Sequence, residues 1–335
     1  MNSTKQTVTS KDVAKLAGVS QSTVSRVFIP GSSVSDKTKQ KVYEAAKALN
    51  YRPNAFARSL TTNESKLIGL VFPDADYPIH MKTLQLISSE LQKLGYSAVL
   101  IPWQVDDKEN HSIPNIFQYR VDGVIAASAT FNKSLYEECE EFNIPIVQYA
   151  RVVEGTKSSY VISDNYEAGQ QAAQLLVDCG VKHPVYLTGE VPTFTNDERH
   201  KGFSSEFEDL TGTLPQVVEA NYDYTAALDD IRQLLKKNDR PDAVFCATDN
   251  LAMALMDVAR YEFNLRIPQD LQVIGFDNIP QTEWLSYQLT TFRQDFKRLA
   301  RESVKIVVDQ INEQNTSMVK MMVPVKLIER NTTSR

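Results

Sequence analysis

Apolar side chains recur at helical spacing in the first part of the chain, which predicts short helices. Within residues 19–27, Val24 and Val27 share one helical face, and most of the other side chains are polar. Ser20 stands near the start of this segment, and its hydroxyl can accept a hydrogen bond from a free N–H of the first turn. The pattern predicts an amphipathic helix that Ser20 caps.

A second helix is predicted directly upstream. Ser10 is its expected N-cap, and Val13, Leu16 and Ala17 form its apolar stripe. Gly18 follows where the helix must end, because glycine readily adopts the left-handed conformation that closes a helix. Two short helices joined by such a turn indicate a helix-turn-helix, whose second helix enters the DNA major groove. The same periodicity is also typical of any small helical hairpin.

A third helix completes a small helical head in residues 1–50. Ser35 is its expected N-cap, and Asn50 ends it. The next segment, 51–65, contains Pro53 in a position suited to the first turn of a short helix and then becomes polar. We expect a hinge helix and a linker there.

From Leu67 onward, short apolar runs alternate with amphipathic segments. Repeated β-α-β units of this kind imply parallel sheets flanked by helices, and the number of strands favours two similar α/β subdomains. The predicted strands are 67–72, 98–101, 121–127, 144–148, 160–163, 185–188, 243–247 and 271–276, and the main predicted helices are 81–94, 167–179, 198–210, 226–235 and 251–263.

Charge divides the chain in the same place as the pattern. The net charge is −6, but residues 1–60 hold ten Lys and Arg against three Asp and Glu. A basic head on an acidic body fits a phosphate-binding module joined to a domain that stays off DNA.

The remaining composition argues against several other classes. The three cysteines are far apart, which indicates a reducing compartment, and the four histidines lack metal-ligand spacing. Residues 1–9 are polar and do not resemble a secretory signal, and no apolar run is long enough for a membrane span. No nucleotide-binding, metal or nucleophile motif is present. We therefore expect a cytoplasmic protein that is not an enzyme and carries no metal or cofactor.

The order of the motifs resembles the lac-repressor (LacI/GalR) family of bacterial regulators. The resemblance rests on Gly18-Val-Ser-x-x-Thr-Val-Ser-Arg-Val27, then Val34-Ser35, then Tyr51-x-Pro-Asn-x-x-Ala-Arg-x-Leu60, and it continues to the C-terminus. It implies a helix-turn-helix head (1–50), a hinge (51–65), and two subdomains like those of periplasmic sugar-binding proteins. Their implied limits are 66–163 with 294–322 and 164–293 with 323–335.

The resemblance also implies how the head reads DNA. The positions that match base-reading residues are Gln21, Ser22 and Arg26, and those that match phosphate-binding residues are Thr23, Ser25 and Ser35. In the hinge, Asn54 and Ala57 match groove-facing positions, and Leu60 matches the residue that wedges between base pairs of the minor groove. Alternatively, Thr23 and Ser25 only cap or solvate the helix and Leu60 packs on the linker. Ile29 replaces a usual asparagine, which would weaken or shift one phosphate contact.

Polar residues after the predicted strands match family positions near the effector. Because ligands of open α/β sheets bind at the carboxyl ends of strands, we expect an effector crevice there. The expected ligands are Asp164, Arg199, Thr248, Asp249 and Asp277, with Tyr222 and Phe296 stacking on an apolar face. Asp249 could instead cap the next helix. Ile79-His80 stands where the family commonly has an aromatic pair, and Tyr287-Gln288 stands where it often has proline.

These features predict a homodimeric repressor of carbohydrate-utilisation genes that binds a pseudo-palindromic operator in double-stranded DNA. A sugar or sugar phosphate in the crevice would switch its affinity by population shift. Two alternatives stay open. One is a global regulator whose co-effector is a phosphorylated carrier protein, and the other is a sugar-binding protein with a vestigial head.

Overall fold

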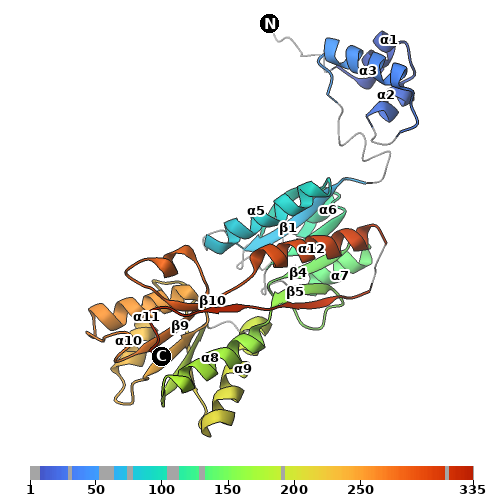
Figure 1. Cartoon of the computed structure of the whole chain (residues 1–335). Coiled ribbons are helices and arrows are strands. Elements are labelled where there is room, and N and C mark those ends of the chain that lie inside the picture. The colour runs from blue at the N-terminus through green and yellow to red at the C-terminus, as the bar shows by residue number, and fades with distance from the viewer. Residues whose placement is uncertain are drawn as a thin grey trace. The chain divides into compact units, whose positions relative to one another are not determined.

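The computed structural model describes residues 8–28, 32–52, 64–73, 78–103, 113–127, 133–189, 193–313 and 317–334 (Figure 1). The chain forms two compact units, Met1–Lys66 and Leu67–Arg335. The predicted fold, a helical head and a two-sheet α/β body, is confirmed. Among the helices in these ranges, none is long and apolar enough to cross a membrane.

Three helices form the head: α1 (Ser10–Ala17), α2 (Gln21–Val27) and α3 (Asp36–Ala48). Val13, Val24 and Val42, one from each helix, are fully buried against one another. Ser20 and Ser35 cap α2 and α3 by accepting from the N–H groups of Thr23 and Thr38, as predicted. Gly18 ends α1 with φ at +65°, in the left-handed conformation expected of it.

Two details of α1 were predicted wrongly. Its N-cap is Thr9 and not Ser10, because Thr9 and Asp12 form a capping box in which the Thr9 N–H donates to the Asp12 carboxylate at 2.9 Å. Leu16 is 57% exposed, and Ala14 occupies the buried position instead. Val13 and Ala17 lie on the core side of α1 as predicted, so only Leu16 was assigned to the wrong face.

The hinge residues Asn54, Ala57 and Leu60, and also Ile29 in the loop after α2, lie outside the described residues. The predicted hinge helix and its minor-groove contacts therefore stay predictions.

The first sheet of the body is entirely parallel, with the strand order β11-β5-β4-β3-β1-β2. Along β1, Ile68, Leu70 and Phe72 pack towards α5 and α12, while Val71 packs towards α6 and α7. This alternation places helices on both faces of the sheet. The elements are β1 (Leu67–Pro73), α5 (Pro78–Lys93), β2 (Ser97–Trp103), α6 (Ile113–Gln118), β3 (Gly123–Ala126), α7 (Lys133–Glu141), β4 (Ile146–Tyr149), β5 (Ser159–Ser163), α12 (Phe296–Ile311) and β11 (Lys320–Val323).

The second sheet has the order β12-β10-β9-β8-β6-β7, and only its edge strand β12 runs antiparallel. The alternating rhythm of the sequence predicted β6, β8 and β9 of this sheet, but not β7, β10 or β12, and it also did not predict β11 of the first sheet. The elements are α8 (Asn165–Asp178), β6 (Pro184–Gly189), α9 (Phe194–Thr211), β7 (Gln216–Ala220), α10 (Leu228–Lys236), β8 (Ala243–Cys246), α11 (Asp249–Tyr261), β9 (Gln272–Asp277), the 3₁₀ turn η1 (Pro280–Glu283), β10 (Thr290–Arg293) and β12 (Lys326–Ile328).

The chain passes between the two sheets three times. The crossings lie between β5 and α8, between β10 and α12, and between β11 and β12 (Figure 1). Because the strands of each sheet are nearly all parallel, their carboxyl ends gather at one edge, and the crossings start from these edges.

Candidate functional site

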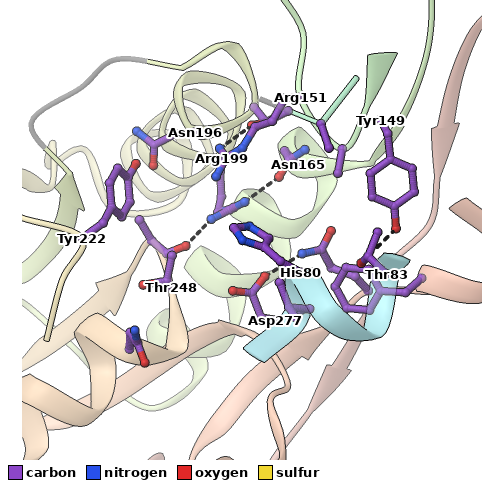
Figure 2. A pocket seen from close by; sticks show the side chains of 18 of the residues that line it. His80, Thr83, Tyr149, Arg151, Asn165, Asn196, Arg199, Tyr222, Thr248 and Asp277 are labelled. Carbon is purple, nitrogen blue, oxygen red and sulfur yellow. Dashed lines mark hydrogen bonds between the residues drawn. The ribbon is translucent and has the colours of Figure 1, made fainter. Parts of the chain in front are cut away.

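A cavity of about 480 Å³ lies between the two sheets (Figure 2). It is lined by residues just after the carboxyl ends of strands, which is where open α/β sheets bind ligands. Five of the seven expected effector residues line it: Arg199, Tyr222, Thr248, Asp277 and Phe296. His80, noted in the sequence as a departure from the family, also lines it. The sequence reasoning missed the other polar members, which are Thr83, Tyr149, Arg151, Asn165, Thr195, Asn196, Asp223, Asn250 and Gln294.

Arg199 is held rigidly at the cavity wall although it is only 7% exposed. Its guanidinium donates to the backbone oxygen of Ala247 and, at 2.7 Å, to Oδ1 of Asn165, and it stacks 3.4 Å from the ring centre of Phe276. Its Nε has no hydrogen-bond partner among the described residues. Burial lowers the pKa of Arg199, and nearby Asp277 opposes that shift.

Two glycines allow Arg199 to reach this position. A Cβ on Gly169 of α8 would lie 2.2 Å from the backbone oxygen of Arg199, and a Cβ on Gly202 of α9 would lie 2.1 Å from the backbone oxygen of Tyr166. The two helices therefore cross with their backbones in direct contact, which no larger residue permits.

Asp277 is joined to the first subdomain through Gln294. Gln294 Nε2 donates to Asp277 Oδ1 at 2.6 Å, and Ser163 Oγ donates to Gln294 Oε1 at 2.6 Å. Ser163 ends β5 and Gln294 follows β10, so the network links two of the three crossings. Asp277 has φ at +125°, a strained conformation for a residue with a side chain. Its carboxylate is 7% exposed and lines the cavity wall.

Asp249 does not line the cavity, in contrast to the expectation for it. It is fully buried, where it accepts from the Thr291 hydroxyl at 2.6 Å and from the Ile279 N–H at 2.9 Å. Burial and the neighbouring Asp277 raise the pKa of Asp249 to about 7. The alternative that Asp249 caps α11 is wrong as well, because Thr248 is the N-cap, and Asn250 lines the cavity beside it.

Asp164 is likewise absent from the cavity lining. Its carboxylate caps α8 by accepting from the Glu167 N–H at 3.0 Å, and the next residue, Asn165, takes the place at the cavity. Thr248 does both: it caps α11 through the Leu251 N–H and also lines the cavity. A residue that caps a helix can therefore also contact a ligand, and the direction of its side chain decides whether it reaches the cavity.

Aromatic side chains form the apolar part of the cavity. Phe72, Tyr149 and Phe296 come from the first subdomain, and Tyr222 comes from the second. The Tyr222 ring lies directly over Gly189, where a Cβ would come within 2.0 Å of it. The Tyr222 hydroxyl is buried and has no hydrogen-bond partner among the described residues. Rings from both subdomains thus face a common space, together with polar groups that can bind hydroxyls.

Arg151 connects the two subdomains across the cavity. It follows β4, and its Nη1 donates to Thr193 Oγ1 at 3.2 Å and to Thr195 Oγ1 at 3.1 Å, both at the start of α9. His80, in the first turn of α5, also points into the cavity (Figure 2). The sequence did carry a signal for Arg151, because it follows a strand as Asp277 does.

In the head, the three expected base-reading residues Gln21, Ser22 and Arg26 are exposed on α2, opposite buried Val24 and Val27. Arg26 makes no hydrogen bond or ion pair with any residue that the structure describes, so its guanidinium is available. Gln21 Nε2 donates to Ser10 Oγ at 3.0 Å, which fixes the side chain but leaves its carbonyl oxygen available.

The expected phosphate ligands have structural partners in the head. Thr23 Oγ1 lies 2.8 Å from Ser20 Oγ, Ser25 Oγ donates to the Gln21 backbone oxygen at 3.2 Å, and Ser35 Oγ caps α3. A hydroxyl keeps further acceptor or donor capacity in such contacts. The arrangement is compatible with phosphate binding, which stays a prediction, as does the alternative that Thr23 and Ser25 only cap or solvate the helix.

Comparisons with known proteins agree with the architecture. Residues 9–54 match the family model "Bacterial regulatory proteins, lacI family", and residues 168–333 match "Periplasmic binding protein-like domain". The HTH-type transcriptional repressor PurR of Yersinia enterocolitica is 32% identical over 327 residues, 96% of each chain. PurR of Mannheimia succiniciproducens is 30% identical and covers 98% of this chain and 99% of its own. The chain belongs to the LacI family.

Solved structures of this family share the fold over its whole length. The lac repressor dimer bound to operator and the anti-inducer ONPF has a TM-score of 0.87 and 28% identity, with 98% of this chain and 99% of that chain covered. The complex of the regulator CelR with cellobiose has a TM-score of 0.72 and 26% identity, with 97% and 99% covered. The protein is a DNA-binding transcriptional repressor of the LacI/PurR type, and its named relatives are repressors and not enzymes.

Proposed function

We propose that this repressor binds a pseudo-palindromic operator as a homodimer and that a sugar or sugar phosphate in the inter-sheet cavity switches its operator affinity. The observation that carries the proposal is the pair Arg199 and Asp277 on one cavity wall. A guanidinium and a carboxylate together bind neighbouring hydroxyls, donating to one oxygen and accepting from another. Aromatic rings beside them suit the apolar face of a sugar ring.

The geometry of the cavity suggests how a ligand would act. Its walls come from both subdomains, and the network Ser163–Gln294–Asp277 reaches two of the three crossings. A ligand that hydrogen-bonds Asp277 would affect the hydrogen bonds of Gln294 and Ser163 at these crossings. It would therefore favour one angle between the subdomains. It shifts the equilibrium only by its differential affinity for the two arrangements.

A second copy of this chain is the proposed partner of the first subdomain. Strand β2 lies at the edge of the first sheet, and its Leu100 is 54% exposed beside Met81 of α5, which is 50% exposed. An exposed apolar strand edge is a surface that proteins normally cover. The lac repressor of similar fold is described as a dimer, which supports this assignment. Leu100→Glu is expected to convert a dimer to a monomer in sedimentation experiments.

In the head, we propose that Gln21, Ser22 and Arg26 read base edges and that Thr23, Ser25 and Ser35 contact phosphates. Their exposure on one side of the head, and the unengaged guanidinium of Arg26, support this proposal. Asn54, Ala57 and Leu60 are proposed to enter the minor groove once the two hinges pair on the operator.

A thermal-shift screen of the purified protein tests the effector class. Sugars and sugar phosphates form the first class of compounds, since a ligand that binds only the folded state raises the Tm by mass action. Purine bases form the second class, because the relatives at 30–32% identity carry the name PurR. Each hit is then added to the protein with operator DNA. A hit from the first class that changes operator affinity supports the proposal, and hits only from the second class overturn its carbohydrate part.

The phosphorylated carrier protein is the second candidate for the co-effector. It would be favoured if operator binding responded to that protein while no small molecule filled the cavity. A vestigial head would show no operator binding at all. The buried core and the capped helices of the head argue against this alternative, because they form a complete helix-turn-helix unit.

A further inference from the structure

A second cavity, of about 640 Å³, lies beside α7 in the first subdomain and shares no lining residue with the inter-sheet cavity. We call it the α7 cavity. One face of α7 borders it, because Lys133, Tyr136, Glu137 and Glu140 follow one another at helical spacing. The other walls come from the starts of β4 and β5, from residues 155–158 between them, and from the end of α12 (Figure 1). The proposed operator and effector sites leave this space unused.

A buried glutamine fixes the connection between β4 and β5 as a wall of the α7 cavity. Gln148 is 2% exposed, and its Nε2 donates to Ser158 Oγ at 2.8 Å and to Thr156 Oγ1 at 3.1 Å. Lys157, in the same connection, forms an ion pair with Glu140 of α7 at 2.6 Å. The wall is therefore tied to the sheet and to the helix, and the cavity is formed before any ligand enters it, as is usual for small-molecule sites.

Two buried hydroxyl groups at the α7 cavity lack an acceptor among the described residues. The Tyr136 hydroxyl makes no hydrogen bond there, although the residue is only 4% exposed. Ser159 is 1% exposed and accepts from the Val319 N–H at 2.9 Å and from Gln310 Nε2 at 3.0 Å, so its own proton is left over. If the Gln310 amide is turned over, a Gln310 N–H is left over instead. Because buried donors without an acceptor are costly, the cavity favours a ligand that brings an acceptor such as a carboxylate.

Charges of both signs are also available at the α7 cavity. Five charged side chains line it, and two of them, Lys157 and Glu140, neutralise each other. The other three, Lys133, Glu137 and Glu313, are exposed and form no ion pair with any residue that the structure describes. A simple anion would be repelled by the two carboxylates, and a simple cation would leave the buried donors unused. A ligand that carries an ammonium group and a carboxylate matches both sets of groups.

We propose that the α7 cavity binds a free α-amino acid with an apolar side chain. The carboxylate of the amino acid accepts from the donors at Ser159 and Tyr136. Its ammonium group bonds the Glu137 carboxylate, one residue along the same face of α7. Its side chain packs on the apolar part of the lining, which consists of Cys139, Ile144, Pro145, Ile146 and Met318. The site itself does not depend on the proposed function, because it lies in a different cavity.

Three segments of the chain line both cavities. Strand β4 begins with Ile146 at the α7 cavity and ends with Tyr149 at the inter-sheet cavity. Helix α12 begins with Phe296 at the inter-sheet cavity and has Gln310, one residue before its end, at the α7 cavity. The connection between β4 and β5 contributes residues to both linings as well. An amino acid beside α7 therefore acts on the walls of the effector cavity and would change operator affinity, a consequence that does rest on the proposed function.

Isothermal titration calorimetry with L-phenylalanine, L-leucine and L-methionine tests the site. The amino acid that binds best is then compared with its matched amine and its matched acid, which for L-phenylalanine are phenethylamine and phenylpropionate. Each analogue is expected to bind about tenfold or more weakly, the effect of one lost charge-assisted contact. The proposal is overturned if none of the three amino acids binds at millimolar concentration, or if either analogue binds as well as the amino acid.

Glu137→Gln and Glu208→Gln form a matched pair of variants, because both residues are exposed on helices and neither has an ion pair among the described residues. Glu137→Gln is expected to bind the amino acid about tenfold more weakly at an unchanged Tm, and Glu208→Gln to bind it as wild type does. Tyr136→Phe removes a hydroxyl that has no partner, so it should weaken binding without lowering the Tm. Unchanged binding by Glu137→Gln overturns the proposal.

Asp277→Asn separates the two cavities and is expected to bind the amino acid as wild type does. If Asp277→Asn loses this binding while Glu137→Gln keeps it, the amino acid occupies the inter-sheet cavity. This inference then fails, although an effector in the inter-sheet cavity still stands. If the amino acid binds as described but no sugar or sugar phosphate ever changes operator affinity, the proposed function fails and this inference stands.

Discussion

Arg199 donates a hydrogen bond from Nη2 to Oδ1 of Asn165 at 2.7 Å, and this contact joins the start of α8 to α9 at the cavity wall. The contact depends on the backbone-to-backbone crossing of these helices. Any change that separates α8 from α9 should therefore move the guanidinium away from its partners and weaken effector binding together with stability.

Gly169→Ala tests this dependence. Because the new Cβ would meet backbone atoms of Arg199 and Phe203 within 2.5 Å, the helices must separate, at a cost of about 1–3 kcal/mol in the free energy of unfolding. Urea unfolding measures that cost, and ligand-induced thermal shift measures the accompanying loss of effector affinity. Gly69→Ala is the matched control, since its Cβ would meet only side-chain ends: Ile101 at 3.3 Å, and Val121 and Val124 at the ordinary contact distance of 3.7 Å. Equal stability of the two variants would contradict this account of the crossing.

The pKa of Asp249, raised to about 7, makes stability depend on pH. The unfolded chain loses this proton near the ordinary aspartate value of about 4. Since the folded chain holds the proton up to about pH 7, raising the pH through this range favours unfolding and lowers the Tm of the wild-type protein.

Asp249→Asn removes this effect, because an amide can still pair with Thr291 and accept from Ile279 without becoming charged. The Tm difference between variant and wild type should therefore shift in favour of the variant by several degrees between pH 5 and pH 8. Asp270→Asn is the control. The ion pair with Arg266 lowers the pKa of Asp270, so this residue changes stability only at pH values below the range that is tested. A constant Tm difference for Asp249→Asn would refute the assignment.

Arg26→Ala should weaken operator binding at least tenfold and leave the Tm nearly unchanged. The side chain is exposed and makes no hydrogen bond or ion pair within the described residues, so its removal should cost the head little stability. A lost guanidinium contact to a base edge is worth about 1–3 kcal/mol. Fluorescence anisotropy with a labelled operator measures the affinity. Lys47→Ala, an exposed cation in the last turn of α3, is the control for a general loss of charge. If both variants lose affinity equally, Arg26 contributes charge and not base reading.

The sequence predicted the fold well because the two-residue and helical periods are strong in this chain. Polar residues after strands, together with the family resemblance, predicted Thr248 and Asp277 at the cavity, and the resemblance alone predicted Arg199, which lies in α9. Periodicity did not decide between adjacent residues, so Thr9 and not Ser10 caps α1, and Asn165 and not Asp164 lines the cavity. Each choice is between two adjacent polar residues. Either residue could fill the position, and the local backbone conformation decides which one does.

Contacts between distant segments could not be predicted from the sequence. Arg151 meets Thr195, which is 44 residues further along the chain and in the other subdomain. The local pattern around either residue gives no sign of this meeting, because it depends on how two separately folded sheets face each other. The burial of Asp249 is a similar case, since it follows from the packing of Thr291 and Ile279 around it.

The most direct test of the switch compares operator affinity with and without an effector hit in wild type and Asp277→Asn. Asparagine has nearly the same shape as aspartate, so it meets the φ of +125° no worse, and it can still accept from Gln294; the fold should therefore be preserved. Fluorescence anisotropy is expected to show equal operator affinity for the two proteins without ligand. With ligand, the wild-type affinity should change at least tenfold and that of Asp277→Asn should not. An equal response of both proteins would show that the ligand acts outside this cavity and would contradict the account.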